Sequence, residues 1–181
     1  HVITTATNIL TLGASATVTV NPGPIPPPDS SFVKGPMRHT VNVSTSVTKI
    51  FPVGKDTTYR RMELIIDQNS VAVTTYTGEL FNNDATNGGC TTLPATLNRV
   101  SKNRYYDVTQ SPATGLDAAT IRMYFGCAAQ NDGVTDLANL AIAKANCPAA
   151  WVDLSGTLSG TEAICSGADY SGYITSGIFT T

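Results

Sequence analysis

Hydrophobic and polar residues alternate along much of the chain, beginning in its first twenty residues. From Val2 to Val20 the even positions are mostly apolar and the odd positions are mostly threonine and serine, and this register continues across Gly13. A period of two residues is typical of a β-strand with one buried face and one exposed face. Because strands usually have about 5–6 residues, the pattern predicts either two strands with a bend near Gly13 or one long ribbon.

A proline-rich segment follows this first β pattern, with five prolines between Pro22 and Pro28. Proline fixes φ and has no N–H group, so the segment cannot join a β ladder. We predict a stiff polyproline II spacer of roughly 20–25 Å; an ordinary surface loop with several prolines is the alternative. The chain is therefore divided into an N-terminal β arm (residues 1–21), a proline-rich linker (22–30) and a β domain (31–181).

The alternation continues beyond the linker. Met62, Leu64 and Ile66 share one face, with Arg61 and Glu63 among the neighbouring residues, and in Ile121–Phe125 apolar residues alternate with Arg122 and Tyr124. Turn-forming sequences separate such segments: Pro52-Val53-Gly54, Asn87-Gly88-Gly89, Ser111-Pro112, Asp132-Gly133 and Ser155-Gly156. Short strands separated by turns are typical of β-sandwiches and barrels. We predict an all-β fold, a β-sandwich of roughly seven to ten strands carrying the N-terminal β arm on its polyproline linker.

One segment, Thr135–Cys147, is compatible with either a helix or a strand. Thr135 is a candidate helix N-cap, and apolar residues follow it at helical spacing. From Leu140 onward the same residues also fit the alternation of a strand. Intrinsic propensity alone favours a helix here.

Charge and hydropathy exclude several classes of partner. Charged residues make up 13% of the chain and the net charge is −2, whereas nucleic-acid binding requires a basic surface. We therefore expect no nucleic-acid partner. No run of 18 apolar residues occurs, so we expect no membrane span. The chain begins at His1 without a leader sequence, and we interpret it as a mature, processed secreted product.

The cysteines predict disulfides. The chain has four cysteines, two histidines and no Cys-x-x-Cys pair, so a zinc site has little support. An even number of cysteines in a chain of secreted character predicts two disulfides. We favour the pairs nearest in sequence, Cys90–Cys127 and Cys147–Cys165, each stabilising the fold by about 3–4 kcal/mol. Four buried free thiols are the alternative.

The sequence contains little that indicates catalysis. His39, beside Arg38, is interpreted as a surface or interface residue, and no Gly-x-Ser-x-Gly motif or plausible Cys–His pair occurs. The Asn82–Gly89 segment has oxygen ligands but lacks the spaced carboxylates of a calcium loop. Aromatic residues that are candidates for stacking on sugars are Tyr105, Tyr106, Trp151, Tyr170 and Tyr173, although a core position is favoured for Trp151. We predict no catalytic residues, cofactor or metal.

Two stretches resemble a known family. Ser30–Leu64 contains a Ser-x-Val-x-Gly-Pro strand, then Phe-Pro-Val-Gly at Phe51–Gly54, a short loop and Tyr59-Arg60. This pattern resembles a repeated module of large secreted surface proteins in gliding-type Gram-negative bacteria. The resemblance implies a β-sandwich module, export by a type IX-like route and a surface or adhesive role. It also implies that Asn139–Ala145 is a strand and that Trp151–Leu154 is its hairpin partner.

Two short motifs are candidate glycosylation sites. Asn42-Val43-Ser44 is an N-glycosylation sequon. Asp56-Thr57-Thr58 resembles the acceptor motif for O-linked glycans in such bacteria. The candidate acceptors are therefore Asn42 and Thr57.

Two functional hypotheses follow, both extracellular or at the cell surface. In the first, the chain is the subunit of a homopolymeric filament, and its arm inserts into a neighbouring copy, as in donor-strand filaments. Burial of the apolar arm residues would contribute at most about 10 kcal/mol, and these residues are Val2, Leu10, Leu12, Val18 and Val20. In the second, the chain is an adhesive or carbohydrate-binding module of a larger protein, with surface glycans as partners.

A hydrolase is a third, weaker candidate. The position of the arm separates the first two hypotheses, because a polymer subunit would deliver its arm to a neighbour.

Overall fold

The computed structural model of the protein describes residues 2–19, 31–42, 44–68, 72–125, 136, 138–159 and 172–180. These residues form fifteen strands and one short 3-10 helix, η1 (Ala85–Gly88). The predicted all-β class is therefore confirmed. The strand number exceeds the roughly seven to ten expected from the alternation, because several strands have only two to four residues.

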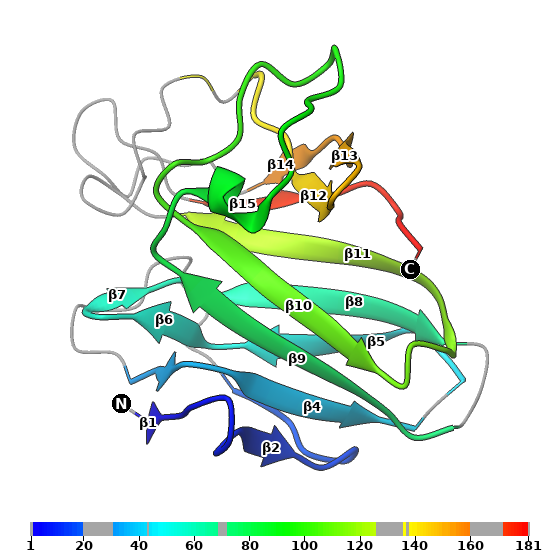
Figure 1. The fold of residues 1–181 in the computed structure, drawn as a ribbon. Helices are drawn as coiled ribbons and strands as arrows, with labels where there is room; N and C mark the ends of the chain where they lie inside the picture. Colours follow the sequence, from blue (N-terminus) through cyan, green and yellow to red (C-terminus); the bar gives the residue numbers. More distant parts are fainter. Residues whose placement is uncertain are drawn as a thin grey trace.

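Two larger sheets pack face to face (Figure 1). Sheet 1 has four strands in the order β10 (Tyr105–Ser111), β9 (Thr74–Phe81), β4 (Met37–Val41) and β2 (Leu10–Leu12). Sheet 2 has five, in the order β14 (Thr157–Ser159), β15 (Gly172–Thr175), β11 (Leu116–Phe125), β8 (Met62–Gln68) and β5 (Val47–Phe51).

Two smaller units complete the described structure. Sheet 3 lies at one end of the sandwich and has the order β1 (Val2–Ile3), β3 (Val33–Lys34), β6 (Val53–Lys55) and β7 (Thr58–Tyr59) (Figure 1). A separate hairpin joins β12 (Ala143–Asn146) to β13 (Ala150–Asp153).

The main core lies between sheets 1 and 2. Apolar side chains at alternate positions of β8 and β11 face the inner side chains of β4 and β9, as the period of two residues predicts. The buried residues of this core are Val33, Met37, Val41, Phe51, Val53, Met62, Leu64, Ile66, Tyr76, Leu80, Ala119, Ile121, Ile142 and Ile174. The alternation in the sequence therefore identified the buried faces of both central strands of sheet 2.

Within the ambiguous segment, Ala143–Asn146 forms a strand, and the other described residues of the segment form no helix. Residues 143–146 pair antiparallel with 150–153, so the β12–β13 hairpin implied by the family resemblance is present. The strand begins later than Asn139, however, because Asn139 lies in a turn. There, the Asn139 backbone N–H and side-chain amide both donate to the Asp136 carboxylate, at 3.3 and 2.7 Å. Pairing with β13 overrides the helical propensity of the isolated segment.

The N-terminal arm lies along its own chain. β1 pairs parallel with β3, and β2 pairs parallel with β4 at the edge of sheet 1. A turn in which the Ala16 N–H donates to the Gly13 carbonyl at 3.0 Å follows β2, whereas the two arm strands are separated earlier, at the turn between Thr5 and Asn8. The described arm therefore pairs with its own chain, and contact of arm residues with another copy stays a prediction. The chain offers the arm an unpaired edge of its own at β4.

Side chains of the arm add to this attachment. Leu10, Leu12 and Val18 pack, partly buried, against the main core, whereas Val2 stays 49% exposed. The buried Lys49 ammonium of β5 donates to the Ala14 carbonyl at 3.2 Å, which ties the arm to sheet 2 as well. Val20 and the proline-rich linker lie outside the described residues.

Gly35 allows the arm to approach the sandwich. Its φ of +119° is a conformation that side chains disfavour, and a Cβ atom there would lie 2.7 Å from the Thr4 Oγ1 atom and even closer to the Thr4 carbonyl oxygen. The Thr4 N–H in turn donates to the Lys34 carbonyl at 3.0 Å. The glycine of the Gly-Pro pattern is thus required by contact with the arm.

We predict that Gly35→Ala releases residues 2–19 from sheets 1 and 3. The strained backbone and the collision with Thr4 together lower the free energy of unfolding by about 1–3 kcal/mol. Hydrogen exchange of the arm measured by mass spectrometry checks this. Gly89→Ala is the matched control, because Gly89 has a φ of +91° but open space around it. Equal protection of the arm in both variants would contradict the prediction.

Candidate functional site

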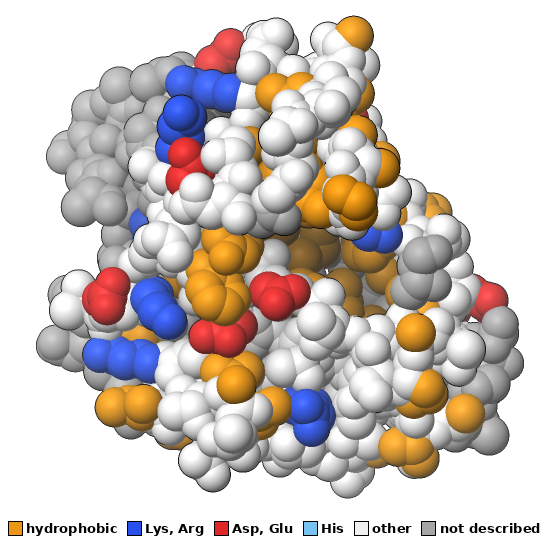
Figure 2. Space-filling view, viewed as in Figure 1, with side chains coloured by type: hydrophobic (Ala, Val, Ile, Leu, Met, Phe, Trp, Pro, Cys, Tyr) orange, Lys and Arg blue, Asp and Glu red, His pale blue; other side chains and the backbone are white. Residues whose placement is uncertain are grey.

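A deep groove opens between the two main sheets beside β10. Its volume is about 1130 Å³. Figure 2 shows it as a recess with hydrophobic side chains at its bottom, on the face seen in Figure 1. Sheet 2 extends further in this direction than sheet 1, since β15 and β14 continue beyond β11 while sheet 1 ends at β10. The groove is therefore an uncovered part of the sandwich interior.

The floor of the groove is the inner face of sheet 2. Alternation along β11 places Leu116, Ala119, Ile121 and Met123 on this face, while the residues between them do not line the groove. Ile174 of β15 extends the apolar floor. Leu116 and Met123 remain only partly buried, which is expected where no strand of sheet 1 lies above them.

One wall of the groove is the edge strand β10. Residues 105–110 all line the groove; Tyr106, Val108 and Gln110 are half-buried, whereas Asp107 and Thr109 are exposed. Val108 and Gln110 were not among the site residues predicted from the sequence. The only available signal was the weak alternation of the residues 105–111, in which Gln110 occupies a position where an apolar residue is expected.

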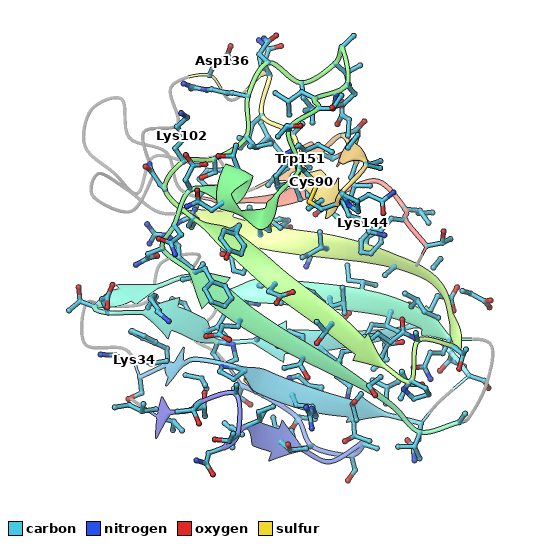
Figure 3. The ribbon with its side chains drawn as sticks, viewed as in Figure 1. Lys34, Cys90, Lys102, Asp136, Lys144 and Trp151 are labelled. Atoms are coloured by element: carbon cyan, nitrogen blue, oxygen red, sulfur yellow. A yellow bond between two sulfur atoms is a disulfide. The ribbon has the colours of Figure 1, made fainter. Side chains whose placement is uncertain are left out.

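The opposite wall comes from the segment 139–145 and the C-terminal residues. Leu140, Ile142 and Phe179 supply apolar surface. Lys144 of β12 lies 5.5 Å above the Phe179 ring and donates to the Thr180 carbonyl at 3.0 Å (Figure 3). The ammonium group therefore stays at the rim, and its aliphatic stem joins the wall.

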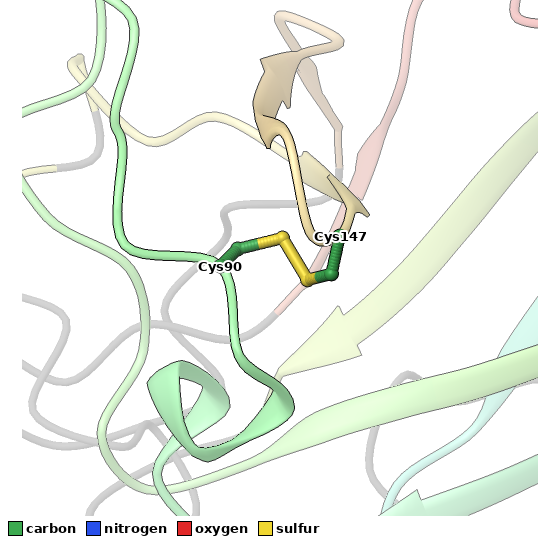
Figure 4. Close-up of a disulfide and its surroundings, with 2 residues drawn as sticks. All are labelled: Cys90 and Cys147. Atoms are coloured by element: carbon green, nitrogen blue, oxygen red, sulfur yellow. A yellow bond between two sulfur atoms is a disulfide. The ribbon is translucent and has the colours of Figure 1, made fainter.

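A disulfide joins Cys90 to Cys147 beside the groove (Figure 4). It links the long 82–104 connection to the β12–β13 hairpin, and both segments line the groove. Cys90 and Trp151 are buried together in a second small core (Figure 3), so the expected core position of Trp151 is confirmed. The sequence-nearest pairing is wrong, because the fold brings Cys147 to Cys90 across a separation of 57 residues. Cys127, Cys165 and Tyr170 lie outside the described residues.

His39 is a core residue, which corrects its interpretation as a surface or interface residue. It has no exposed surface, packs edge-on against Phe51 with ring centroids 4.8 Å apart, and uses Nε2 to bond the Ile50 carbonyl at 2.8 Å. Burial lowers the pKa of His39 below its ordinary value, and the nearby Lys49 charge also lowers it. This histidine lies far inside the sandwich and faces no open cavity.

The buried carboxylate Glu63 is held by its neighbours on the outer face of sheet 2. It forms ion pairs with Arg61 and, at 2.7 Å, with Arg122, and it accepts a hydrogen bond from the Tyr124 hydroxyl at 3.0 Å. Arg61 lies over the Tyr124 ring and Arg122 over the Tyr173 ring. A carboxylate with both oxygens occupied in this way is suited to structure rather than to proton transfer.

The described residues contain no cluster of three or more His, Cys, Asp or Glu side chains that could hold a metal ion. In the candidate calcium segment, the Asp84 carboxylate accepts hydrogen bonds from the Thr86 N–H at 2.9 Å and the Thr86 hydroxyl at 2.6 Å. These bonds lower the pKa of Asp84. The Asp84 carboxylate caps the short 3-10 helix η1, so in this segment it has a structural role.

Both candidate glycosylation acceptors are exposed in turns. Asn42 follows β4, and Thr57 lies between β6 and β7 next to Asp56, whose φ is +55°. The two turns lie at opposite ends of the sandwich (Figure 1). Among the candidate sugar-stacking residues, Tyr105 lies stacked against Phe81, with ring centroids 5.1 Å apart. Tyr105, Tyr106 and the buried Trp151 all line the groove, whereas Tyr173 lies on the outer face of sheet 2.

Comparison with known protein families, with characterised proteins and with solved structures finds no match to this chain. Within the described ranges, no helix has the length and apolar character that crossing a bilayer requires.

We predict that the double variant Cys90→Ser/Cys147→Ser unfolds more easily. The open loop gains conformational freedom in the unfolded state, so the free energy of unfolding falls by about 2–4 kcal/mol. Urea denaturation of the folded variant and of the wild type measures this difference. An unchanged denaturation midpoint would contradict the disulfide's structural role.

We predict that His39 makes the fold weaker in mild acid. The folded-state pKa of His39 lies below the ordinary value of 6.5. The contribution of neutral His39 to the free energy of unfolding is therefore fully present above that pH and is lost as the pH falls through the lowered pKa. The unfolding free energy of the wild type should therefore decrease from about pH 7 to about pH 5 more steeply than that of His39→Gln. Parallel urea titrations at both pH values test this, and equal slopes would refute it.

Proposed function

We propose that this chain is a non-catalytic, extracellular binding module of a larger surface protein, and that it holds its ligand in the groove beside β10. The observation that carries the proposal is the open apolar floor of β11 between two walls of half-buried side chains. A concave, mainly apolar site with a few polar groups at its rim is typical of a binding site.

The position of the arm supports a module rather than a polymer subunit. Its two strands pair with β3 and β4, and Lys49 holds the turn that follows. An arm attached in this way is not available to a neighbour without breaking these contacts. The filament hypothesis needs a free arm and the module hypothesis does not, so this pairing favours the module.

The chemistry of the groove favours an apolar ligand over a sugar. Sugar sites combine exposed aromatic faces with many hydrogen-bonding side chains. In this groove the floor consists of aliphatic and sulfur-containing side chains, and the aromatic and polar side chains lie in the walls. The aromatic residue with the largest ring system, Trp151, is 8% exposed and packs in the second core. Adhesion would then depend on apolar contact rather than on glycan stacking.

The proposed extracellular location is supported by the Cys90–Cys147 disulfide. Disulfides persist in oxidising compartments and are rare in the cytosol. The exposure of Asn42 and Thr57 is compatible with glycosylation of a surface protein.

We predict that the groove binds a small apolar probe in the folded protein. The probe is 1-anilinonaphthalene-8-sulfonate, whose fluorescence rises when it enters an apolar site. Val108→Lys places a charge in the wall and should weaken probe binding by about fivefold or more.

Ser111→Lys is the matched control, since it adds the same charge to an exposed residue of β10 that does not line the groove. It should bind the probe as the wild type does, and circular dichroism of both variants verifies that they are folded. Failure of the folded wild type to bind the probe, or equal loss in both variants, would refute the groove as a binding site.

A further inference from the structure

The groove has the form of a missing strand position. Sheet 1 ends at β10, and in the described part of the chain no other strand pairs with the outer side of β10. Beneath this free edge, the inner face of β11 presents apolar side chains at alternate positions. An edge strand above an apolar floor offers hydrogen bonds and side-chain pockets to one more strand.

The other side of the groove is bordered by the β12–β13 hairpin. Within the described residues, β12 pairs only with β13, and residues of both strands, among them Lys144 and Trp151, line the groove. The Ile142 N–H donates to the Ser155 carbonyl at 2.9 Å, and the Ile142 carbonyl accepts from the Leu154 N–H at 2.8 Å, which anchors the base of the hairpin. The gap therefore lies between the edge strand β10 and this hairpin.

The size of the groove also favours an extended chain over a compact molecule. Pockets for small ligands usually have volumes of about 300–1,000 Å³, and this groove has about 1130 Å³. It runs beside a strand of seven residues, β10. Its length therefore suits a peptide segment of similar length.

Gln110 supplies a polar group for such a segment. Its Nε2 atom donates to the Thr114 carbonyl at 3.1 Å, but its Oε1 atom is buried and has no hydrogen-bond partner among the described residues. A buried acceptor without a donor is unfavourable. A backbone N–H arriving beside β10 would provide the donor, whereas a hydrocarbon ligand would not.

We propose that the groove binds an extended polypeptide segment of a partner protein, with apolar side chains at every second position, as an additional strand of sheet 1. The inference rests on the proposed function and specifies its ligand. The segment pairs through its backbone with β10 and directs alternate apolar side chains onto the β11 floor, while its other side chains face solvent. Charge plays a minor part, because the floor contains no ionised side chain.

The occupant is distinct from the chain's own arm in the described structure. The arm occupies the β4 edge of sheet 1, and the groove lies at the opposite edge, with β9 and β4 between them. The same pattern of residues would nevertheless fit both positions. The corresponding segment of a second copy is therefore one source of the peptide that the experiment must include.

The experiment measures peptide binding by fluorescence anisotropy. The first probe is a labelled nine-residue peptide with valine at odd positions and threonine or lysine at even positions. The second is a peptide with the sequence of residues 8–20 of this chain. Each peptide is compared with two analogues that are N-methylated at alternate backbone nitrogens. One analogue lacks the N–H donors along one edge of the peptide, and the other lacks those along the opposite edge. These analogues keep the side chains but remove backbone donors along one edge.

The first peptide should bind the wild type and the Ser111→Lys variant equally and bind Val108→Lys at least about fivefold more weakly. N-methylation along the edge that faces β10 should weaken binding by about tenfold or more. Hydrogen exchange should also slow in residues 107–111 when the peptide is bound, because the peptide adds backbone hydrogen bonds along β10.

Each result decides between the two proposals. If the anilinonaphthalene probe binds but neither peptide does, the groove is a binding site and the strand inference is wrong. If a peptide and both of its N-methylated analogues bind equally well, backbone pairing is absent and the inference is again overturned. If neither probe nor peptide binds the folded protein, the proposed function fails as well. Preferential binding of the 8–20 peptide would make a second copy the occupant and would overturn the assignment to a segment of a different partner protein.

Discussion

The structure depends on how the inner face of sheet 2 is covered. This sheet has five strands, and its central strands β8 and β11 carry apolar residues at every second position. Sheet 1 has only four strands, one of which is the short arm strand β2. Different elements therefore cover different parts of this inner face. The arm covers the β5 side, β4 and β9 cover the middle, and the β12–β13 hairpin covers the β14 side. The groove is the part that none of these elements covers.

The two edges of sheet 1 are treated differently. At the β4 edge, β2 completes the ladder, and Gly35 lacks the side chain that would collide with the nearby arm. At the β10 edge, a seven-residue strand borders an apolar floor. Open edges above apolar surface are sites where a β protein either finds a partner or aggregates. The same physical demand thus explains the attachment of the arm and motivates the proposed role of the groove.

Much of the candidate site was beyond prediction because its residues are distant in sequence. The alternation in Ile121–Phe125 correctly identified the buried face of β11, but it could not reveal that a strand was absent above it. The prediction paired Cys90 with the cysteine nearest in sequence. Its actual partner, Cys147, is near in space because the 82–104 connection packs against the β12–β13 hairpin. His39 looked like a surface residue beside Arg38, yet strand alternation turns the two side chains to opposite faces, and His39 faces the core.

The sequence by itself determined the all-β class and the inward faces of β8 and β11, because each follows from local periodicity. The family resemblance added the β12–β13 hairpin, where intrinsic propensity favoured a helix. Only the tertiary structure decided where the arm lies, which cysteine meets Cys90, and where the sandwich remains open. These features depend on which strand edges pair in the folded chain. All strand edges carry the same backbone N–H and C=O groups, so local sequence does not specify which edges pair.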